Sequence, residues 1–352
     1  MEGTSFESSL ARKIETRHQV LLATNDYDVR TPNRCRGLLH IINQEEEPLL
    51  SSVQKQISFT VALNGFFIAS PPVRGLICFY EVKEDKYYRF SIYNQATKTC
   101  RALASTQADE TTLMETHFGY DEIKDEFKVL CIKSNLENLW NVITYEVLTV
   151  GRPSEESWRR IECKVPHTSV SHHGVFDDRG TLYYLAHCKY DDTHTKNDIM
   201  SFNVSSEEFK PIPSPDGVDL INIGNWRLVN YKKKIVLVDD ENGFVYKPNG
   251  DVYVEIWPVF EERRRILIRN WRDYARGPAN ELRYYDRFRG TTRTGELVFS
   301  PTKVTTEGSV TVIFYNMSTQ TLRRSVVQLL GRGNENRFVD TFLDYVHNPL
   351  PV

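Results

Sequence analysis

The residues best suited to chemistry in this sequence include one short stretch of potential metal ligands. They are His187, Cys188, Asp191, Asp192 and His194. A structural zinc site needs four ligands in a closed tetrahedron. The spacing here matches no established zinc motif, and loops that follow strands often collect such side chains. We therefore expect a polar loop here, without a metal or another cofactor.

A second set of reactive side chains combines histidines with serines. It consists of His167, Ser169, Ser171, His172 and His173. A hydrolase would present its serine on a Gly-x-Ser-x-Gly turn, and the sequence has none. It also has neither a phosphate-binding P-loop nor a dinucleotide-binding fingerprint. We interpret this set as a polar loop between strands, with no catalytic residue.

Paired carboxylates are the third candidate for chemistry. Asp125–Glu126 and Asp239–Asp240 each join two acids, and a pair of acids is what glycoside hydrolysis requires. Both pairs flank expected strands as turn residues. Their separation in space is left open by the sequence.

An arginine-rich segment at 263–276 is the candidate for a contact with a partner. The residues that we predict to touch a partner are Arg263, Arg264, Arg265, Arg269, Trp271 and Tyr274. Arginine beside exposed aromatic residues is typical of protein-binding hot spots, and it can also contact RNA. The alternative is a solvated rim loop whose charge is balanced by Glu261, Glu262 and Asp273.

Composition narrows the function classes. The 352 residues carry a net charge of -3, which argues against general nucleic-acid binding. No apolar run of about 18 residues is present, so we expect no membrane span. The first residues lack the pattern of a secretory signal, so we expect a cytoplasmic or nuclear protein. The six isolated cysteines are then reduced thiols, most of them buried.

The elements that position these residues are expected to be short strands. Aromatic residues make up 12% of the chain, which favours strands over helices. The run Phe127–Ile132 follows a polar turn at 121–126 and is too short for a buried helix. It hardly alternates between apolar and polar residues, which predicts a strand covered on both faces.

A hairpin motif recurs along the chain. An aromatic residue precedes Asn94, Asn203 and Asn316, and a small or hydroxyl residue and a further strand follow each of them. Asparagine tolerates left-handed backbone geometry, so we expect it to make the turn. The intervals of 109 and 113 residues predict a repeat unit of about 55 residues, close to the roughly 50 of kelch repeats.

The stretch 117–133, which reads HFGYDEIKDEFKVLCIK, resembles the signature of the plant F-box-associated domain of the kelch-like type 3. Similar segments occur at Gly180–Ala186, Thr294–Pro301 and Thr341–Val346. Nothing upstream of Phe6 has room for an F-box, so the sequence resembles the associated domain without its F-box. The resemblance implies an all-β propeller at 18–352, preceded by a polar segment at 1–17. We expect about six blades, with seven as the alternative.

A propeller must protect the edges of its sheets. We therefore expect the strand near Val20 to pair with the C-terminal strands at 338–346.

The resemblance implies a protein-interaction module rather than an enzyme. It would be the substrate-recognition part of a plant SCF-type E3 ubiquitin ligase, with an unknown target protein as its partner. A Skp-type adaptor and a cullin would be further partners if the chain docks to a ligase. We expect no nucleic acid, membrane or cofactor. The alternative is a propeller enzyme such as a glycoside hydrolase, which would require a carboxylate-lined central pocket.

Overall fold

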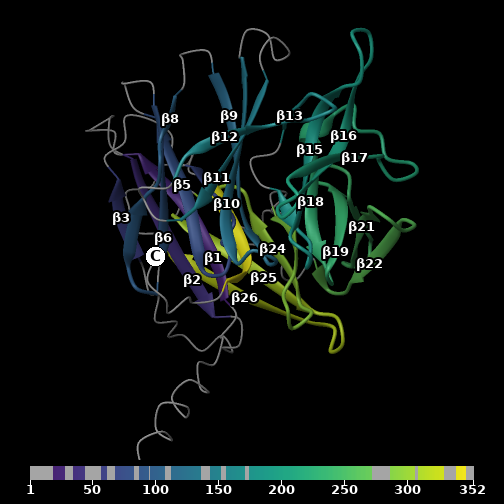
Figure 1. Cartoon of the computed structure of the whole chain (residues 1–352). Coiled ribbons are helices and arrows are strands. Elements are labelled where there is room, and N and C mark those ends of the chain that lie inside the picture. Colours follow the sequence, from purple (N-terminus) through teal and green to yellow (C-terminus); the bar gives the residue numbers. More distant parts are fainter. Residues whose placement is uncertain are drawn as a thin grey trace, which may run out of the picture.

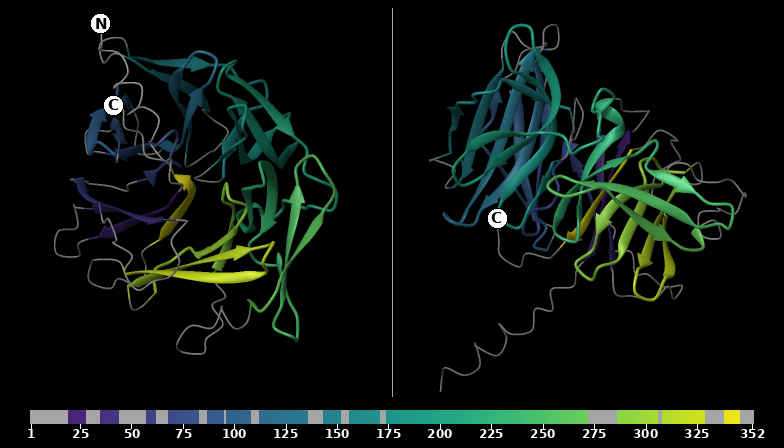
Figure 2. Two further views of the ribbon diagram at one scale, coloured as in Figure 1. Left: turned by 90° about the horizontal axis from the view of Figure 1, so that it is seen from below. Right: turned by 90° about the vertical axis from the view of Figure 1, so that its right-hand side faces the viewer.

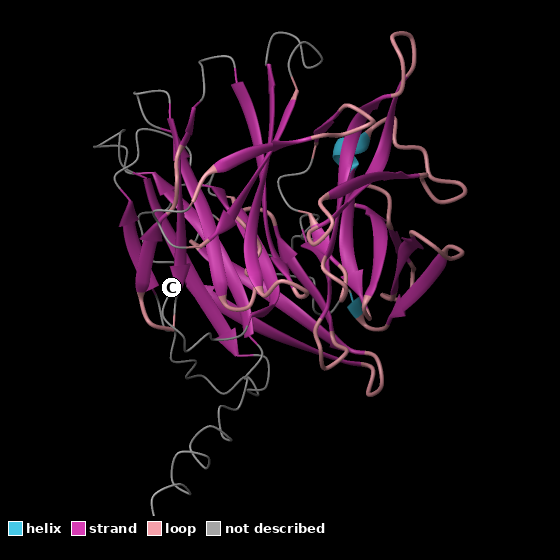
Figure 3. Ribbon diagram, in the orientation of Figure 1, coloured by secondary structure: helices cyan, strands magenta, loops and turns pink. Residues whose placement is uncertain are grey.

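The described part of the chain consists mainly of strands joined by turns and loops (Figures 1 and 3). The structure is a computed structural model, and it describes residues 19–27, 35–43, 57–61, 68–82, 87–94, 96–107, 112–135, 143–151, 156–170, 174–271, 286–305, 308–328 and 338–345. A short 3-10 helix, η1, spans Ile223–Asn225. No helix among the described residues has the length and apolar character needed to cross a membrane.

Six antiparallel sheets form the blades of a propeller, as the resemblance implied, and Figure 2 shows them arranged in a ring. Blade 1 consists of β27 (Val339–Tyr345), β1 (Gln19–Tyr27), β2 (Cys35–Asn43) and β3 (Ile57–Val61). Blade 2 consists of β4 (Ile68–Ala69), β5 (Leu76–Val82), β6 (Tyr87–Asn94), β7 (Thr99–Ala102) and β8 (Thr106–Gln107). Blade 3 consists of β9 (Thr112–Asp121), β10 (Glu126–Asn135), β11 (Thr144–Val150) and β12 (Trp158–Ile161).

The remaining three blades follow in chain order. Blade 4 consists of β13 (His167–Ser169), β14 (Val175–Phe176), β15 (Thr181–Lys189), β16 (Thr195–Asn203) and β17 (Glu208–Ile212). Blade 5 consists of β18 (Trp226–Tyr231), β19 (Lys234–Asp239), β20 (Phe244–Tyr246), β21 (Val252–Pro258) and β22 (Arg264–Ile268). Blade 6 consists of β23 (Asp286–Thr291), β24 (Leu297–Pro301), β25 (Ser309–Asn316) and β26 (Thr321–Gln328). The innermost strands of neighbouring blades meet, since β23 contacts both β18 and β27.

Because strands in a blade are antiparallel, the connections divide between two faces of the propeller. We call one the turn face: it carries the turns between first and second and between third and fourth strands, such as 122–125 and 204–207. The loop face carries the turns between second and third strands, such as 190–194, and the links between blades, such as 213–225.

Among the described residues, the hydrophobic core forms six clusters, and each lies between two neighbouring blades. Strand β10 shows how one strand serves two of them. Val129 and Cys131 point into the cluster shared with blade 2, whereas Leu130 and Ile132 point into the cluster shared with blade 4. A strand packed this way is apolar on both faces. The prediction for Phe127–Ile132 is therefore confirmed.

The repeated asparagine motif makes hairpins, as predicted, but by a different mechanism. The side-chain oxygen of Asn94, Asn203 or Asn316 accepts hydrogen bonds from the amides two and three residues later. The left-handed residue comes fourth after the asparagine: it is Lys98, Glu207 or Gln320, with φ of 57°, 60° and 57°. The asparagine contributes to the turn through its short acceptor side chain. The prediction that the asparagine itself has left-handed backbone geometry is wrong.

The ring closes between the two ends of the described chain. Strand β1 pairs with β2 on one side and with the C-terminal strand β27 on the other, for instance Leu22 opposite Thr341. Figure 2 shows these purple and yellow strands side by side. The predicted closure is confirmed, and it gives β1 a hydrogen-bonded neighbour at each edge.

Candidate interaction surface

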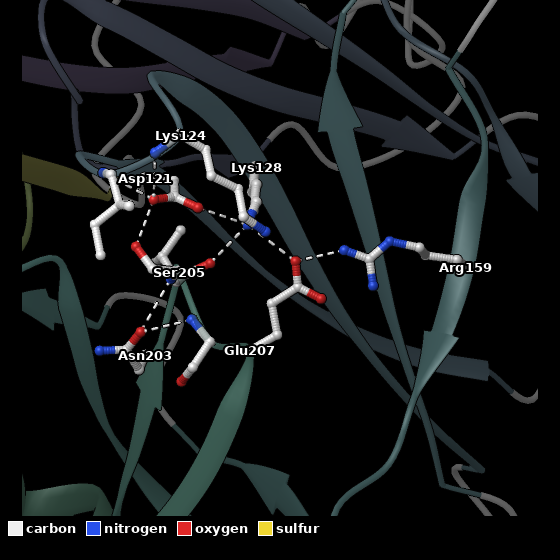
Figure 4. Close-up of polar contacts among 10 residues, drawn as sticks. Asp121, Lys124, Lys128, Arg159, Asn203, Ser205 and Glu207 are labelled. Carbon is white, nitrogen blue, oxygen red and sulfur yellow. Dashed lines mark hydrogen bonds and ion pairs between the residues drawn. The ribbon is translucent and has the colours of Figure 1, made fainter.

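The signature stretch places a buried ionic network between blades 3 and 4, on the turn face (Figure 4). Asp121 ends β9 and is fully buried. Its carboxylate accepts hydrogen bonds from the amides of Ile123 and Lys124 and from the Ser205 hydroxyl of blade 4. The chain around Asp121 makes the same turn as the asparagine hairpins, because Asp125 has φ of 58°.

Lys128 is the cation of this network, and its side chain is only 2% exposed. Its Nζ atom lies 2.9 Å from Asp121 Oδ2, 2.9 Å from the Val204 carbonyl oxygen and 2.9 Å from Glu207 Oε1. Position 128 shares its strand face with Leu130 and therefore points at blade 4. The lysine that interrupts the apolar run is thus a buried residue that links blades 3 and 4 through ion pairs and a hydrogen bond.

The pKa shifts show that the network favours the charged forms. Burial alone would raise the pKa of the Asp121 carboxyl, but the hydrogen bonds it accepts outweigh burial and hold that pKa well below its usual range. Burial alone would lower the pKa of Lys128, but its carboxylate partners raise it above its ordinary value. The pKa of Glu207 is lowered despite its partial burial by hydrogen bonds from Arg159 and Lys128.

Arg159 closes the network at the surface. Its guanidinium donates to Glu207 and is 47% exposed, whereas Glu207 is 11% exposed. Arg159 is therefore the outermost member of the network and shields the acid beneath it. The network holds two blades in register, and it offers a partner little more than this one guanidinium.

The arginine-rich segment divides between surface and core. The side chains of Arg263, Arg264 and Arg265 are 46%, 56% and 60% exposed. Arg263 and Arg265 both bind the nearly buried carboxylate of Glu255, and Arg264 lies 2.7 Å from Glu261. These three arginines, on or next to the outer strand β22, remain accessible to a partner.

The aromatic part of that prediction needs correction. Trp271 is 2% exposed and packs against Phe299 at 4.8 Å, inside the cluster between blades 5 and 6. Its large apolar ring is buried in the core, so it cannot form the exposed anchor that the sequence indicated. Arg269 is exposed, and Tyr274 lies outside the described residues.

The metal-like stretch at 187–194 forms a strand end and a turn. His187 Nδ1 contacts Asn197 Oδ1, and the Asp191 carboxylate accepts from the amides of Thr193 and His194 at 2.8 Å each. Lys189 lies 2.9 Å from Asp192. Within the described ranges, no group of three or more histidines, cysteines, aspartates or glutamates could hold a metal ion.

His167 is a buried structural residue. Its Nδ1 lies 2.9 Å from the Val165 carbonyl oxygen, which can only accept, and its Nε2 lies 2.6 Å from the Tyr184 hydroxyl. Burial lowers the pKa of His167 to about 4, so the ring is neutral near pH 7. Ser169 is also buried, and Ser171, His172 and His173 lie outside the described residues.

The two carboxylate pairs belong to turns, where the sequence placed them. Asp125 accepts from the Tyr120 hydroxyl, and Asp239 accepts from the amides of Glu241 and Asn242. Asp240 forms an ion pair with Arg227.

A polar pocket on the loop face, between blade 4 and the link to blade 5, was not indicated by any sequence pattern. Its volume is about 610 Å³, within the range of ligand pockets. It is lined by His187, by 195–197 and by 214–221. Asn197 donates to the Leu220 carbonyl oxygen at 2.7 Å and so ties the blade link to the sheet. Ile221, on the pocket wall, is 77% exposed, which is unusual for a large apolar side chain.

Comparison with known proteins gives the same family over most of the chain. The model of the F-box associated beta propeller domain matches residues 25–346. "Putative F-box protein At1g76830" of Arabidopsis thaliana is 50% identical over 317 residues, 88% of this chain and 79% of that protein. The similarly named At1g70960, also from Arabidopsis thaliana, is 32% identical over 98% of this chain and 88% of that protein.

Among solved structures, the chain is similar to the β-propeller domain of the Trilobed protease from Pyrococcus furiosus. It is 11% identical with a TM-score of 0.38, over 88% of this chain and 80% of that chain. A likeness this distant says nothing about activity. The matched family is one of interaction domains found in F-box proteins rather than an enzyme family. From its six-bladed fold, its signature stretch and these relatives, the chain belongs to the F-box-associated β-propeller family.

Proposed function

We propose that the chain recognises a target protein through the loop face of its propeller, as the substrate-recognition part of an SCF-type ubiquitin ligase would. The observation that carries the proposal is the family match over residues 25–346 together with relatives named as F-box proteins. Docking to a Skp-type adaptor and a cullin belongs to the proposal too, and so does a cytoplasmic or nuclear location.

The loop face is favoured because a pocket and an exposed apolar side chain coincide there. Ile221 stands on the wall of the 610 Å³ pocket. An exposed apolar side chain beside a polar cavity is a common arrangement for binding a segment of another protein. The arginines at 263–265 lie at the turn between the third and fourth strands of blade 5, which is on the turn face, and would form a separate contact that fits acidic target residues.

The test is an affinity pull-down from plant extract with the 1–352 chain as bait, read by mass spectrometry. We expect a specific target protein, and Skp-type and cullin subunits if the chain docks to a ligase. A specific target without ligase subunits would leave a stand-alone binding domain and remove ubiquitin transfer from the proposal. Recovery of no specific protein would contradict the proposal as a whole.

The structure offers a matched pair of variants for this pull-down. Ile221→Asp places a charge on the loop face, and Ile123→Asp does the same on the turn face, where Ile123 is 84% exposed. Both side chains are largely solvated, so neither change should unfold the chain. We expect Ile221→Asp alone to reduce recovery of the target. Loss with Ile123→Asp instead would move the contact to the turn face.

A further inference from the structure

Three arginines from two innermost strands meet near the axis of the propeller. Arg227 is the second residue of β18 in blade 5, and Arg287 and Arg289 lie on β23 in blade 6. Arg227 and Arg287 stand near the strand ends that face the loop face, because the links between blades enter there. No local sequence pattern indicates this cluster, because Arg227 and Arg287 are 60 positions apart.

The carboxylates that face this cluster do not balance its charge. Arg227 and Arg287 both pair with Asp240, and the Arg287 guanidinium also donates to the Asp240 carbonyl oxygen. Arg289 donates to the Ser300 hydroxyl and to the Pro301 carbonyl oxygen, each at 2.8 Å, and both of these are uncharged. Asp340 of β27 is the second acid near Arg289. Among the described residues, three guanidiniums thus share two carboxylates.

The cluster is incompletely satisfied, yet it is within reach of solvent. The Nε atom of Arg227 is buried and has no hydrogen-bond partner among the described residues. Burial, reinforced by the neighbouring Arg227, lowers the pKa of Arg289 below its ordinary value. The side chains of Arg227 and Arg287 are nevertheless 22% and 26% exposed. An anion could therefore reach the cluster and would relieve its excess positive charge.

We propose that this cluster, Arg227, Arg287 and Arg289, binds the phosphate group of a phosphorylated serine or threonine in a target protein. A phosphate carries close to two negative charges and three acceptor oxygens, so it can accept hydrogen bonds from several guanidiniums at once. A carboxylate brings one charge and two oxygens and would match three guanidiniums less well. The inference rests on the proposed function, because the phosphate would belong to the recognised target.

The test uses a pool of peptides with a fixed phosphoserine or phosphothreonine between randomised positions, and the same pool without phosphate. The full 1–352 chain is measured by fluorescence anisotropy as wild type, Arg287→Gln and Arg74→Gln. Arg74 is the matched control, because it is a half-exposed arginine that pairs with Glu122 on the turn face. We expect the phosphorylated pool to bind about tenfold more tightly, and Arg287→Gln to lose about tenfold, as for one charged hydrogen bond. Arg74→Gln should change binding less than about twofold, because it removes only an exposed ion pair on the other face.

A measurement on the wild type covers the case in which Arg287→Gln fails to fold. Inorganic phosphate should compete with the phosphorylated pool, and chloride at equal ionic strength should not. If inorganic phosphate raises the Tm but the phosphorylated pool is not preferred, the site takes small free anions and the proposal is overturned. Equal binding of both pools, or equal losses in the two variants, also overturns it.

Phosphatase treatment of the plant extract separates this inference from the proposed function. A target recovered equally well before and after treatment, and by Arg287→Gln, would leave protein recognition standing and remove the phosphate site. Binding of the phosphorylated pool without any protein recovered from extract would support the phosphate site and contradict the proposed recognition of a target protein.

Discussion

The Nζ atom of Lys128 lies 2.9 Å from Glu207 Oε1, although the two residues belong to different blades and are 79 positions apart in the sequence. Lys128 is the first buried residue of β10, and Glu207 occupies the left-handed position of the hairpin that follows Asn203. The contact joins the two strongest sequence patterns of the chain, the signature stretch and the asparagine hairpin. Neither pattern by itself indicates that it contacts the other.

Replacement of Lys128 by methionine should destabilise the chain by about 3–5 kcal/mol, because it leaves the fully buried carboxylate of Asp121 without its cation and leaves Glu207 with Arg159 alone. Lys124→Met, at an exposed position of the same turn, is the control and should change stability by less than about 0.5 kcal/mol. Urea unfolding followed by tryptophan fluorescence measures both. A Lys128→Met chain as stable as the control would show that the network contributes nothing to the fold.

His167 should make stability fall in mildly acidic solution. Its pKa is about 4 in the folded chain and about 6.5 when unfolded. Between these values the unfolded state binds more protons, so the free energy of unfolding decreases as the pH falls, by up to about 1.4 kcal/mol per pH unit. This contribution is fully present above pH 6.5 and is lost toward pH 4.

Urea midpoints at pH 7, 6 and 5 test the His167 prediction, with His167→Gln compared against His194→Gln. His194 is exposed, so its replacement should leave the slope unchanged. The His167→Gln chain should be less stable at pH 7, because two buried hydrogen bonds are altered, but it should have a shallower slope. If stability changed with pH by the same slope in wild type and His167→Gln, His167 would not be the group that causes the loss of stability in acid. The carboxylates of Asp121 and Glu207 do not interfere, since their lowered pKa values place the loss of their contribution below about pH 4.5.

Asn316→Ala should destabilise the chain by about 1 kcal/mol, since the amides of Ser318 and Thr319 lose their acceptor. Asn316→Asp should be nearly neutral, because Asp121 and Asp239 make the same pair of hydrogen bonds in other turns of this propeller. Thermal unfolding of the three chains measures the difference. Equal losses for alanine and aspartate would mean that the amide nitrogen of Asn316, rather than its oxygen, stabilises the turn.

Local pattern determined much of this protein. The apolar run Phe127–Ile132 required a strand covered on both faces, and the spacing of Asn94, Asn203 and Asn316 required regular hairpins, because both depend on residues that are neighbours in the chain. The pairing of β1 with β27 also followed, since a ring of blades must close to protect its edges. The structure decided the number of blades, which is six, where the sequence left six or seven open.

Tertiary structure decided which charged and aromatic residues face a partner. Lys128 in an apolar run and Trp271 in a basic segment both end in the core, because the neighbouring blade supplies a carboxylate for one and an apolar cluster for the other. Arg227 and Arg289 meet only because β18 and β23 are adjacent innermost strands. Contacts between blades join residues far apart in sequence, so no local pattern encodes them, and the candidate binding sites of a propeller are made from such contacts.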